Sequence, residues 1–371
     1  MKPAAPLWLA APSRFAGLSR KRARWVLALV ALGLLLALTA LASVGPAPVS
    51  GAGAPSRDDQ SDVVLYESIV DGIRHGGDYY TVAAGALRAG DYPLRPFVTF
   101  RLPGLAQIQA HMPAIIVIIS LYLLSFCVVI AWAIRLREAL RGWAPLTIAL
   151  ALVAGGMMAF VQSDLWAFHE IWAGLLIALS LALRRPDRWL TAVAIALIAM
   201  LIRETAALYA LVMLGMAWRD GARREALGWA VALALFAAAL GAHAFAVMAV
   251  TTPADPASPG WAGLHGPGFA VQAVALSTAV RLFPLWIAAP LVALSLFGWA
   301  AWRDPLGSRV WATIATFGAL LALAARPDTF YWALMIAPLS LVGLVFVPDG
   351  LRDLMRQALD KRRITVTRVT R

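Results

Sequence analysis

Residues 114–134 read AIIVIISLYLLSFCVVIAWAI, and this stretch decides the fold class because it holds no charged side chain. A helix of about 20 apolar residues is long enough to cross the hydrocarbon core of a bilayer. The stretch lacks the alternation of polar and apolar residues that marks a strand of a membrane β-barrel. Because backbone groups in lipid must be hydrogen-bonded within their own segment, the stretch predicts a membrane-spanning α-helix.

The rest of the chain has the same character. Of its 371 residues, 61% are hydrophobic and 14% are charged, and the mean hydropathy is +0.75, whereas soluble domains contain about 25% charged residues. The single cysteine, Cys127, excludes a disulfide framework and a cysteine metal cluster. We therefore predict an all-α, polytopic membrane bundle of about ten spans, at residues 25–44, 114–134, 144–161, 167–183, 189–202, 205–218, 227–250, 284–302, 310–325 and 330–347.

Three of these runs have a second interpretation. The run 25–44 ends in a sequence that resembles a signal-peptide cleavage region, but it is longer than the ~7–15 apolar residues of a signal peptide. We therefore expect an uncleaved first helix. The runs 189–202 and 205–218 meet at Arg203-Glu204, and they could form one long bent segment, which would change the topology of every later loop.

The distribution of positive charge predicts the orientation. With a cytoplasmic N-terminus, most of the 32 Lys and Arg residues fall on the cytoplasmic side, as the positive-inside rule requires, and ten spans fit better than nine. The predicted organisation, in a bacterial-type inner membrane, is a basic cytoplasmic N-terminus (1–24), a membrane domain (25–347) with periplasmic loops at 45–112 and 251–283, and a basic cytoplasmic tail (348–371). The tail is amphipathic and is expected to lie as a helix on the anionic inner leaflet. Because the net charge of +12 follows from topology, we expect no nucleic-acid partner.

The loop 45–112 is too long to be a simple turn and carries its own helical pattern. Leu65, Ile69 and Ile73 follow one another at a spacing of four, which predicts a helix that begins at Ser61 or Asp62 and ends before a Gly-Gly pair. A second short helix is expected over 81–88. The two helices would form an amphipathic pair along the membrane surface.

Residues 59–103 resemble the GT-C superfamily of integral-membrane glycosyltransferases, which use polyprenyl-phosphate-linked sugars. The similar branch is that of the protein O-mannosyl and lipid A aminoarabinose transferases. Its Asp-Glu, followed by Tyr four residues after the Asp, corresponds to Asp62 and Tyr66. Its Gly-Asp-Trp corresponds to Gly77-Asp78-Tyr79, and its Lys-Pro-Pro to Arg95-Pro96.

The sequence departs from that pattern at three positions. Val63 replaces the Glu, Tyr79 replaces the Trp, and Phe97 replaces the second Pro. Further along, Asp164 resembles the family's second outer acid and Arg203 resembles a basic residue before a span. A late Arg…Tyr…Pro pattern is similar to Arg326, Tyr331 and Pro338.

The charged residues near the predicted spans map to their outer ends, which favours a shared cavity over a site at the bilayer midplane. The resemblance implies transfer of a sugar from a polyprenyl phosphate to an unknown glycan, lipid or protein acceptor. Such a transfer needs a carboxylate to take a hydroxyl proton and cations to stabilise the departing phosphate. We predict Asp62 as the general base, with Asp59 as an alternative base and Asp164 as a helper. The phosphate would bind Arg203, Arg326 and Arg101, and the sugar or acceptor would meet Tyr66, His169, Glu170 and Glu204.

Each of these roles has a structural alternative. Asp62 could serve only as a helix N-cap, Asp164 could be an interfacial residue, and Arg203 could pair with Glu204 or Asp164. The sequence neither requires nor excludes a divalent cation, because no His pair has the spacing of a metal site. At the level of function, the alternatives are a transporter or flippase for a lipid-linked saccharide and a non-catalytic membrane subunit. We expect repeats or broken helices in a transporter and see neither in the sequence.

Overall fold

A computed structural model describes residues 5–43, 62–162, 165–260 and 263–360, and these residues are helical with only isolated β-bridges. Helices occupy all ten predicted apolar runs. In nine of these runs most residues belong to one α-helix: α1 (Arg20–Leu38), α5 (Ala114–Ala139), α6 (Trp143–Gly156), α7 (His169–Leu183), α8 (Leu190–Ile202), α9 (Ala207–Arg219), α10 (Arg223–Val250), α12 (Leu285–Ala301) and α13 (Pro305–Ala324). The last run is broken into the 3-10 helix η8 (Pro327–Met335), α14 (Ala337–Ser340) and the 3-10 helix η9 (Val342–Phe346).

The lengths of these helices indicate a multi-pass membrane protein. Within the described residues, four helical stretches are long and apolar enough to span a bilayer, namely α1 with its short extension, α5, α10 and α13, and a fifth is added if the segments after Ala325 count as one span bent by 73°. The other apolar helices include α8 with 13 residues and α12 with 17. At about 1.5 Å per residue they are shorter than the roughly 30 Å hydrocarbon core. The structure thus supports four to five of the ten predicted spans by length.

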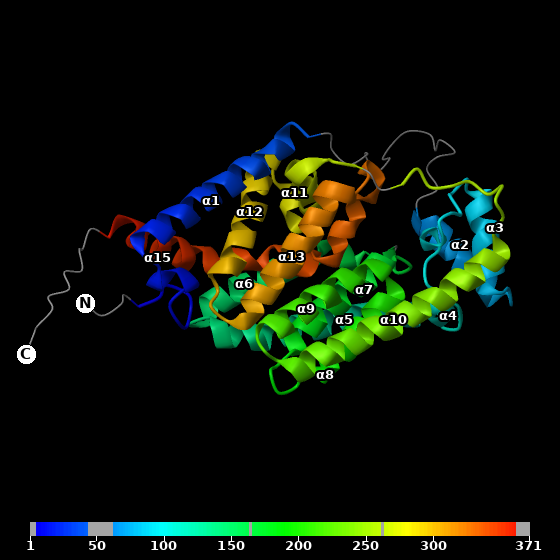
Figure 1. The fold of residues 1–371 in the computed structure, drawn as a ribbon, viewed down its shortest axis with the longest axis horizontal. Coiled ribbons are helices and arrows are strands. Elements are labelled where there is room, and N and C mark those ends of the chain that lie inside the picture. The colour runs from blue at the N-terminus through cyan, green and yellow to red at the C-terminus, as the bar shows by residue number, and fades with distance from the viewer. Residues whose placement is uncertain (1–4, 44–61, 163–164, 261–262, 361–371) are drawn as a thin grey trace, which may run out of the picture.

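The long helices run between two distinct ends of the molecule (Figure 1). The start of α1 and the helix α15 (Val347–Leu359) lie at one end, which we call the inner end. The helices of the first long loop, α2 (Asp62–Arg74), α3 (Tyr79–Ala89) and α4 (Gly104–Ala110), lie at the opposite, outer end.

The chain reverses direction at Arg203. The start of α8 lies beside the C-terminal part of α7, where the Ser180 hydroxyl donates to the Ala192 carbonyl, and Arg203 at its end meets Glu170 in the first turn of α7. After a short 3-10 turn, α9 runs back, and the hydroxyl of Tyr209 lies 2.8 Å from that of Ser180. The runs 189–202 and 205–218 are therefore two segments of opposite direction, and the alternative of one bent segment is wrong.

The two helices predicted in the first loop are present. α3 is capped by Asp78, which accepts a hydrogen bond from the Thr81 amide, and Gly76 adopts a φ of 91°, a left-handed conformation that glycine tolerates without strain. The apolar face of α2 is buried in the main core of the protein. Protein therefore covers the apolar face of this helix.

Two further regions differ from expectation. The loop 251–283 contains a buried helix, α11 (Gly266–Leu276), which packs against α12 and α13 and was not predicted. The tail does form the amphipathic helix α15, but it docks on protein as well. Asp349 accepts hydrogen bonds from three backbone amides near the N-terminus, at 2.6–2.8 Å, and Leu354 and Ala358 are buried.

Candidate functional site

Four charged residues meet at the outer end, and we call them the outer charge cluster: Arg101, Glu170, Arg203 and Glu204. Arg203 stands at the break after α8 with an extended backbone, and Glu170 lies in the first turn of α7. Nε of Arg203 is 2.6 Å from Oε1 of Glu170, and its second ion pair is with Glu204. Arg203 is 1% exposed and Glu170 is 0% exposed, so this pairing takes place inside the protein.

Arg101 ties the first loop to this cluster. Its guanidinium lies 3.5 Å from Oε1 of Glu204, and its Nε donates to the hydroxyl of Tyr66 at 3.0 Å. The hydroxyl of Tyr79 in turn donates to the backbone carbonyl of Arg101 at 2.5 Å. Burial raises the pKa of Tyr66, so its phenol stays protonated across the physiological range.

An aromatic layer lies against the cluster. The ring of Tyr66 meets that of His169 edge-on at 4.8 Å and that of Phe168 at 6.0 Å. Phe168 also meets Tyr331 edge-on at 5.1 Å. Because these rings come from α2, from the start of α7 and from η8, the layer joins three distant parts of the chain.

Asp62 is the first residue of α2, and its side chain is only partly buried. Burial, the charge of Asp62 and a hydrogen bond to Asp62 together raise the pKa of Tyr92, whose phenol therefore remains a donor to the carboxylate. The negative charge of Asp62 also interacts electrostatically with the side chains of Tyr331 and Arg326. Residue 61, which precedes Asp62, lies outside the described residues, and so does the helix boundary on which the alternative role of Asp62 as an N-cap depends.

Several buried polar atoms in this region have no hydrogen-bond partner among the described residues. They include Nδ1 of His169, both carboxylate oxygens of Glu170 and Nε of Arg203. The 2.6 Å contact between Arg203 and Glu170 is an ion pair by distance, but its direction is unsuitable for a hydrogen bond. Buried polar groups are usually satisfied, so an unsatisfied carboxylate at the outer end points to a functional role or to a bound water or ion.

The structure brings together six of the predicted site residues and places two beside them. Tyr66, Arg101, His169, Glu170, Arg203 and Glu204 form one connected group through the contacts above. Asp62 and Arg326 lie at its edge, and Arg326 is ion-paired with Asp328. Asp59 and Asp164 lie outside the described residues.

The arrangement favours Arg326 over Arg203 as the residue that a phosphate would contact first. Arg203 is enclosed by two carboxylates, which is the structural pairing that the sequence left open, whereas the side chain of Arg326 is 28% exposed. A phosphate arriving from outside would therefore meet Arg326 before Arg203. Within the described residues, no group of three His, Cys, Asp or Glu side chains could hold a metal ion.

Other residues of the glycosyltransferase-like motif make local structural contacts. One contact of the candidate site, between Tyr92 and Asp62, was not predicted from the sequence. Asp78 caps α3, and Nε of Arg95 donates to the backbone carbonyl of Asp255 in the second outer loop at 2.9 Å. The sequence analysis did not assign Tyr92 to the site. Its hydrogen bond to Asp62 joins residues 30 positions apart, and only the path of the intervening helices brings them together.

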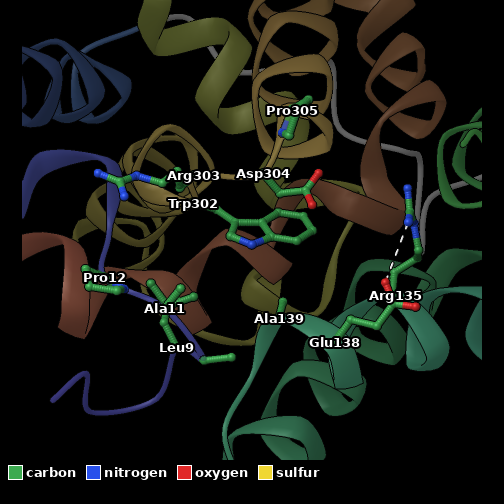
Figure 2. Close-up of a pocket in the computed structure, with 11 residues that line it drawn as sticks. Leu9, Ala11, Pro12, Arg135, Glu138, Ala139, Trp302, Arg303, Asp304 and Pro305 are labelled. Atoms are coloured by element: carbon green, nitrogen blue, oxygen red, sulfur yellow. Dashed lines mark ion pairs between the residues drawn. The ribbon is translucent and has the colours of Figure 1, made fainter. Parts of the chain in front are cut away.

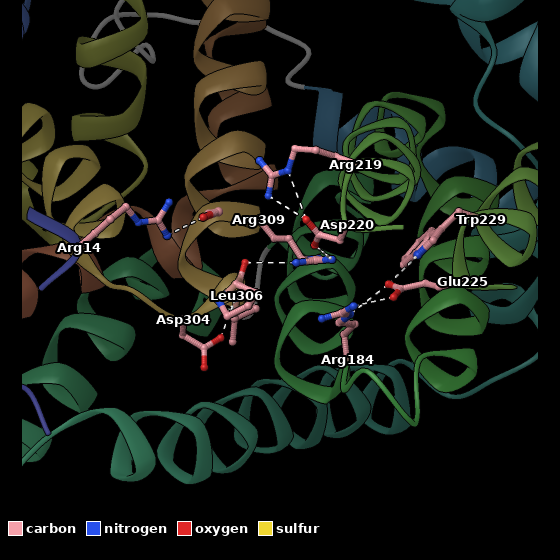
Figure 3. Close-up of polar contacts among 11 residues, drawn as sticks. Arg14, Arg184, Arg219, Asp220, Glu225, Trp229, Asp304, Leu306 and Arg309 are labelled. Atoms are coloured by element: carbon pink, nitrogen blue, oxygen red, sulfur yellow. Dashed lines mark hydrogen bonds and ion pairs between the residues drawn. The ribbon is translucent and has the colours of Figure 1, made fainter. Parts of the chain in front are cut away.

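The inner end has a different character. A cavity of about 370 Å³ lies there between the N-terminal segment, the end of α5 and the α12–α13 connection, with Trp302, Asp304 and Arg135 among its lining residues (Figure 2). Beside it, Arg184 is paired with Glu225, and Arg309 with Asp220 (Figure 3). These ion pairs join the end of α7 to α10 and the end of α9 to α13, so their role is to hold the helices together.

No family model, curated protein or solved structure matches this chain. Function is therefore inferred from the chemistry of the outer end. That chemistry consists of the partly exposed carboxylate of Asp62 hydrogen-bonded to a phenol, the partly exposed guanidinium of Arg326, and the buried outer charge cluster. Such a set can accept a proton and stabilise a departing anion.

Proposed function

We propose that the protein is a membrane glycosyltransferase that moves a sugar from a polyprenyl-phosphate carrier to a glycan, lipid or protein acceptor. The observation that supports this proposal is that Asp62 is hydrogen-bonded to Tyr92 and that its charge interacts with Arg326 and with Tyr66, which bonds to Arg101 of the outer charge cluster. The resemblance of residues 59–103 to GT-C transferases supports the same conclusion.

In the proposed reaction, Asp62 accepts the proton of an acceptor hydroxyl while the hydroxyl oxygen attacks the anomeric carbon of the sugar. A new carbon–oxygen bond forms as the bond from that carbon to the phosphate oxygen breaks, and the electron pair leaves with the lipid phosphate. Arg326 and Arg101 stabilise the charge on this leaving group. Arg203 acts through Glu204 as a positioning residue, because it is buried between two carboxylates.

We place this reaction on the periplasmic face of a bacterial inner membrane, with about ten spans and with both termini in the cytoplasm. The support is the placement of the basic N-terminus of α1 and the helix α15 at the end opposite α2 and α3. The short helices α7 and α8 would cross only with neighbours around them, and their extensive burial fits that arrangement. A donor lipid would reach the site from the surrounding bilayer.

A flippase for a lipid-linked saccharide is the second candidate. The sequence suggested no broken helices, but this is wrong for two places. The chain is interrupted at Arg203, and the segments after Ala325 are bent by 73°. Discontinuous helices beside a binding site are a feature of transporters, and they also allow an enzyme to present backbone and side chains to a cavity.

The two candidates are distinguished by chemistry. Purified protein in proteoliposomes should release free polyprenyl phosphate from a panel of polyprenyl-phosphate sugars only when an acceptor is present. Asp62→Asn keeps the size of the side chain but removes its basicity, so turnover should fall by roughly 10²–10⁴-fold. Asp71→Asn on the exposed part of the same helix is the matched control and should retain full activity.

The pattern of failure is informative. Movement of the labelled lipid across the bilayer without release of its phosphate would replace the transferase with the flippase. Full turnover in Asp62→Asn would remove Asp62 as the base, and Asp59→Asn would then be the next variant. A protein that neither turns over nor moves any donor of the panel would favour the non-catalytic subunit.

A further inference from the structure

A groove of about 490 Å³ at the inner end is lined by Arg20, Lys21, Arg24 and Trp25, all on the first turns of α1. All four residues are exposed, and Trp25 is 64% exposed. The guanidinium groups of Arg20 and Arg24 bond to a backbone carbonyl, which leaves their positive charge without compensation from that contact. The groove is therefore strongly positive and has an aromatic ring at its edge.

The two arginines of the groove are held in place by the neighbouring helix. Nε of Arg20 and Nε of Arg24 both donate to the carbonyl of Ala358, in the last turn of α15, at 3.4 and 3.3 Å. Cationic groups commonly satisfy free carbonyls at a helix C-terminus. The contact uses one nitrogen of each guanidinium and holds two like charges, four residues apart, on the same side of α1, where they repel one another unless an anion lies between them.

The groove continues directly into an apolar surface. Lys21, Trp25, Leu32 and Leu36 follow at spacings of four, seven and four, which places them on one face of α1. Leu32 is 49% exposed and Leu36 is 41% exposed. Only 11% of the most apolar window of this helix is buried in the protein. One face of α1 thus carries, in order, cations, an interfacial tryptophan and exposed leucines.

We propose that this groove is a binding site for an anionic phospholipid of the inner leaflet. The phosphate diester lies between Arg20 and Arg24, where guanidinium groups offer paired donors to phosphate oxygens. Trp25 lies at the level of the headgroup, as aromatic residues of membrane proteins do. The acyl chains lie along Leu32 and Leu36. A free phosphate ion would use only the first of these contacts, and for this reason the structure favours the lipid.

The site also gives α15 a second attachment. Leu354 and Ala358 of α15 are buried in a cluster with Ala23 of α1 and Phe297 of α12, whereas Met355 and Leu359 of the same helix are exposed. A lipid bound between the arginines would hold the guanidinium groups that bond to Ala358. The proposal is independent of the transferase reaction, because it concerns the opposite end of the molecule.

The test uses full-length protein, delipidated in neutral detergent, and counts bound lipids by native mass spectrometry. The probes are phosphatidylglycerol and phosphatidylcholine with the same acyl chains. Wild type should bind one phosphatidylglycerol in preference to phosphatidylcholine. Arg24→Ala should lower the affinity for phosphatidylglycerol about 5-fold, and Arg20→Ala/Arg24→Ala about 25-fold, the effect of one and two cations at a membrane surface.

The matched control is Arg22→Ala, which removes the same charge from the same helix outside the groove and should change the affinity less than 2-fold. Equal losses in Arg22→Ala and Arg24→Ala would mean general charge attraction and would overturn the site. Displacement of the lipid by 10 mM inorganic phosphate would replace the lipid with a soluble anion. If the alanine variants do not fold, Arg20→Lys/Arg24→Lys keeps the charge and should retain the preference with weaker binding; loss of all preference there would equally contradict the proposal.

Discussion

Both ends of the bundle bury arginine–carboxylate pairs, but they satisfy them differently. At the inner end, Glu225 accepts two hydrogen bonds from Arg184, at 3.0 and 2.5 Å, and a third from the indole of Trp229 at 3.3 Å (Figure 3). At the outer end, Glu170 lies 2.6 Å from Arg203, yet neither of its oxygens has a hydrogen-bond partner among the described residues.

This difference indicates that the Arg184–Glu225 pair stabilises the fold, whereas the Arg203–Glu170 pair belongs to a candidate functional site. A buried carboxylate that accepts three hydrogen bonds from neighbouring side chains is suited to hold helices together. A buried carboxylate that is ion-paired without aligned hydrogen bonds keeps oxygens that a ligand, a proton or a water can use. The outer end also carries Asp62 and Arg326, whose charges interact with each other near the pair. Equivalent substitutions at the two ends test whether the two ion pairs really differ in this way.

The largest expected effect comes from removing an arginine at each end. Arg203→Ala leaves Glu170 and Glu204 without their shared cation, and Arg184→Ala does the same to Glu225. Each should destabilise the fold by about 3–5 kcal/mol, because a buried charge is left uncompensated. Thermal unfolding in detergent measures the loss for both, and a stable Arg203→Ala protein would show that the outer pair is not buried as described.

The corresponding lysine variants separate stability from activity. Arg203→Lys and Arg184→Lys keep the charge and lose the planar fork, so both should fold. Turnover should fall only in Arg203→Lys, because Arg203 positions the groups beneath Asp62. A similar loss of turnover in Arg184→Lys would mean that activity reports general packing, and the comparison of the two ends would fail.

Intermediate effects are expected from the carboxylates. Glu225→Gln disrupts charged hydrogen bonds and should cost about 1.5–3 kcal/mol of unfolding free energy. Glu170→Gln should cost less, because Arg203 retains Glu204 and the oxygens of Glu170 make no hydrogen bonds to lose. Melting temperatures of the two variants test the order. A larger loss in Glu170→Gln than in Glu225→Gln would show that the outer carboxylate is the better satisfied of the two.

The smallest effect concerns the contact between the two outer loops. Arg88 forms an ion pair with Asp255 at 2.8 Å, and hydrogen bonds from Arg88 and from Thr252 hold the pKa of Asp255 well below its usual value. A lowered folded-state pKa gives stability that is present above the ordinary Asp pKa of about 3.9 and is lost as pH falls through the lower value. The protection factors of amides in residues 251–258, which remove the intrinsic pH dependence of hydrogen exchange, should thus stay constant from pH 7 to pH 5. Lower protection at pH 5 than at pH 7 would contradict the contact, and Arg88→Ala is the variant in which the loop should be less protected at both pH values.

The sequence was sufficient to predict the helices of the bundle and much of the candidate site. Apolar runs in the sequence correspond to the observed helices within a few residues, and the motif around Asp62 and Tyr66 identified the loop that carries them. Glu170, Arg203 and Glu204 were recognised because charges at the ends of apolar runs are uncommon. The contact between Tyr92 and Asp62, by contrast, depends on how α2 and α3 fold back on one another.

The sequence could not determine whether protein or lipid covers each apolar helix face. α11 was assigned to a loop and α15 to the membrane surface, whereas protein covers α11 and the part of α15 that carries Leu354 and Ala358. A lipid tail and a leucine side chain are about equally apolar, so hydropathy identifies a segment that avoids water without indicating its neighbour. The sequence by itself therefore determined that the chain is helical, apolar and rich in charge at the helix ends. Only the tertiary structure decided which helices pack against protein, and which charges meet at the outer end, because these depend on contacts between residues far apart in the chain.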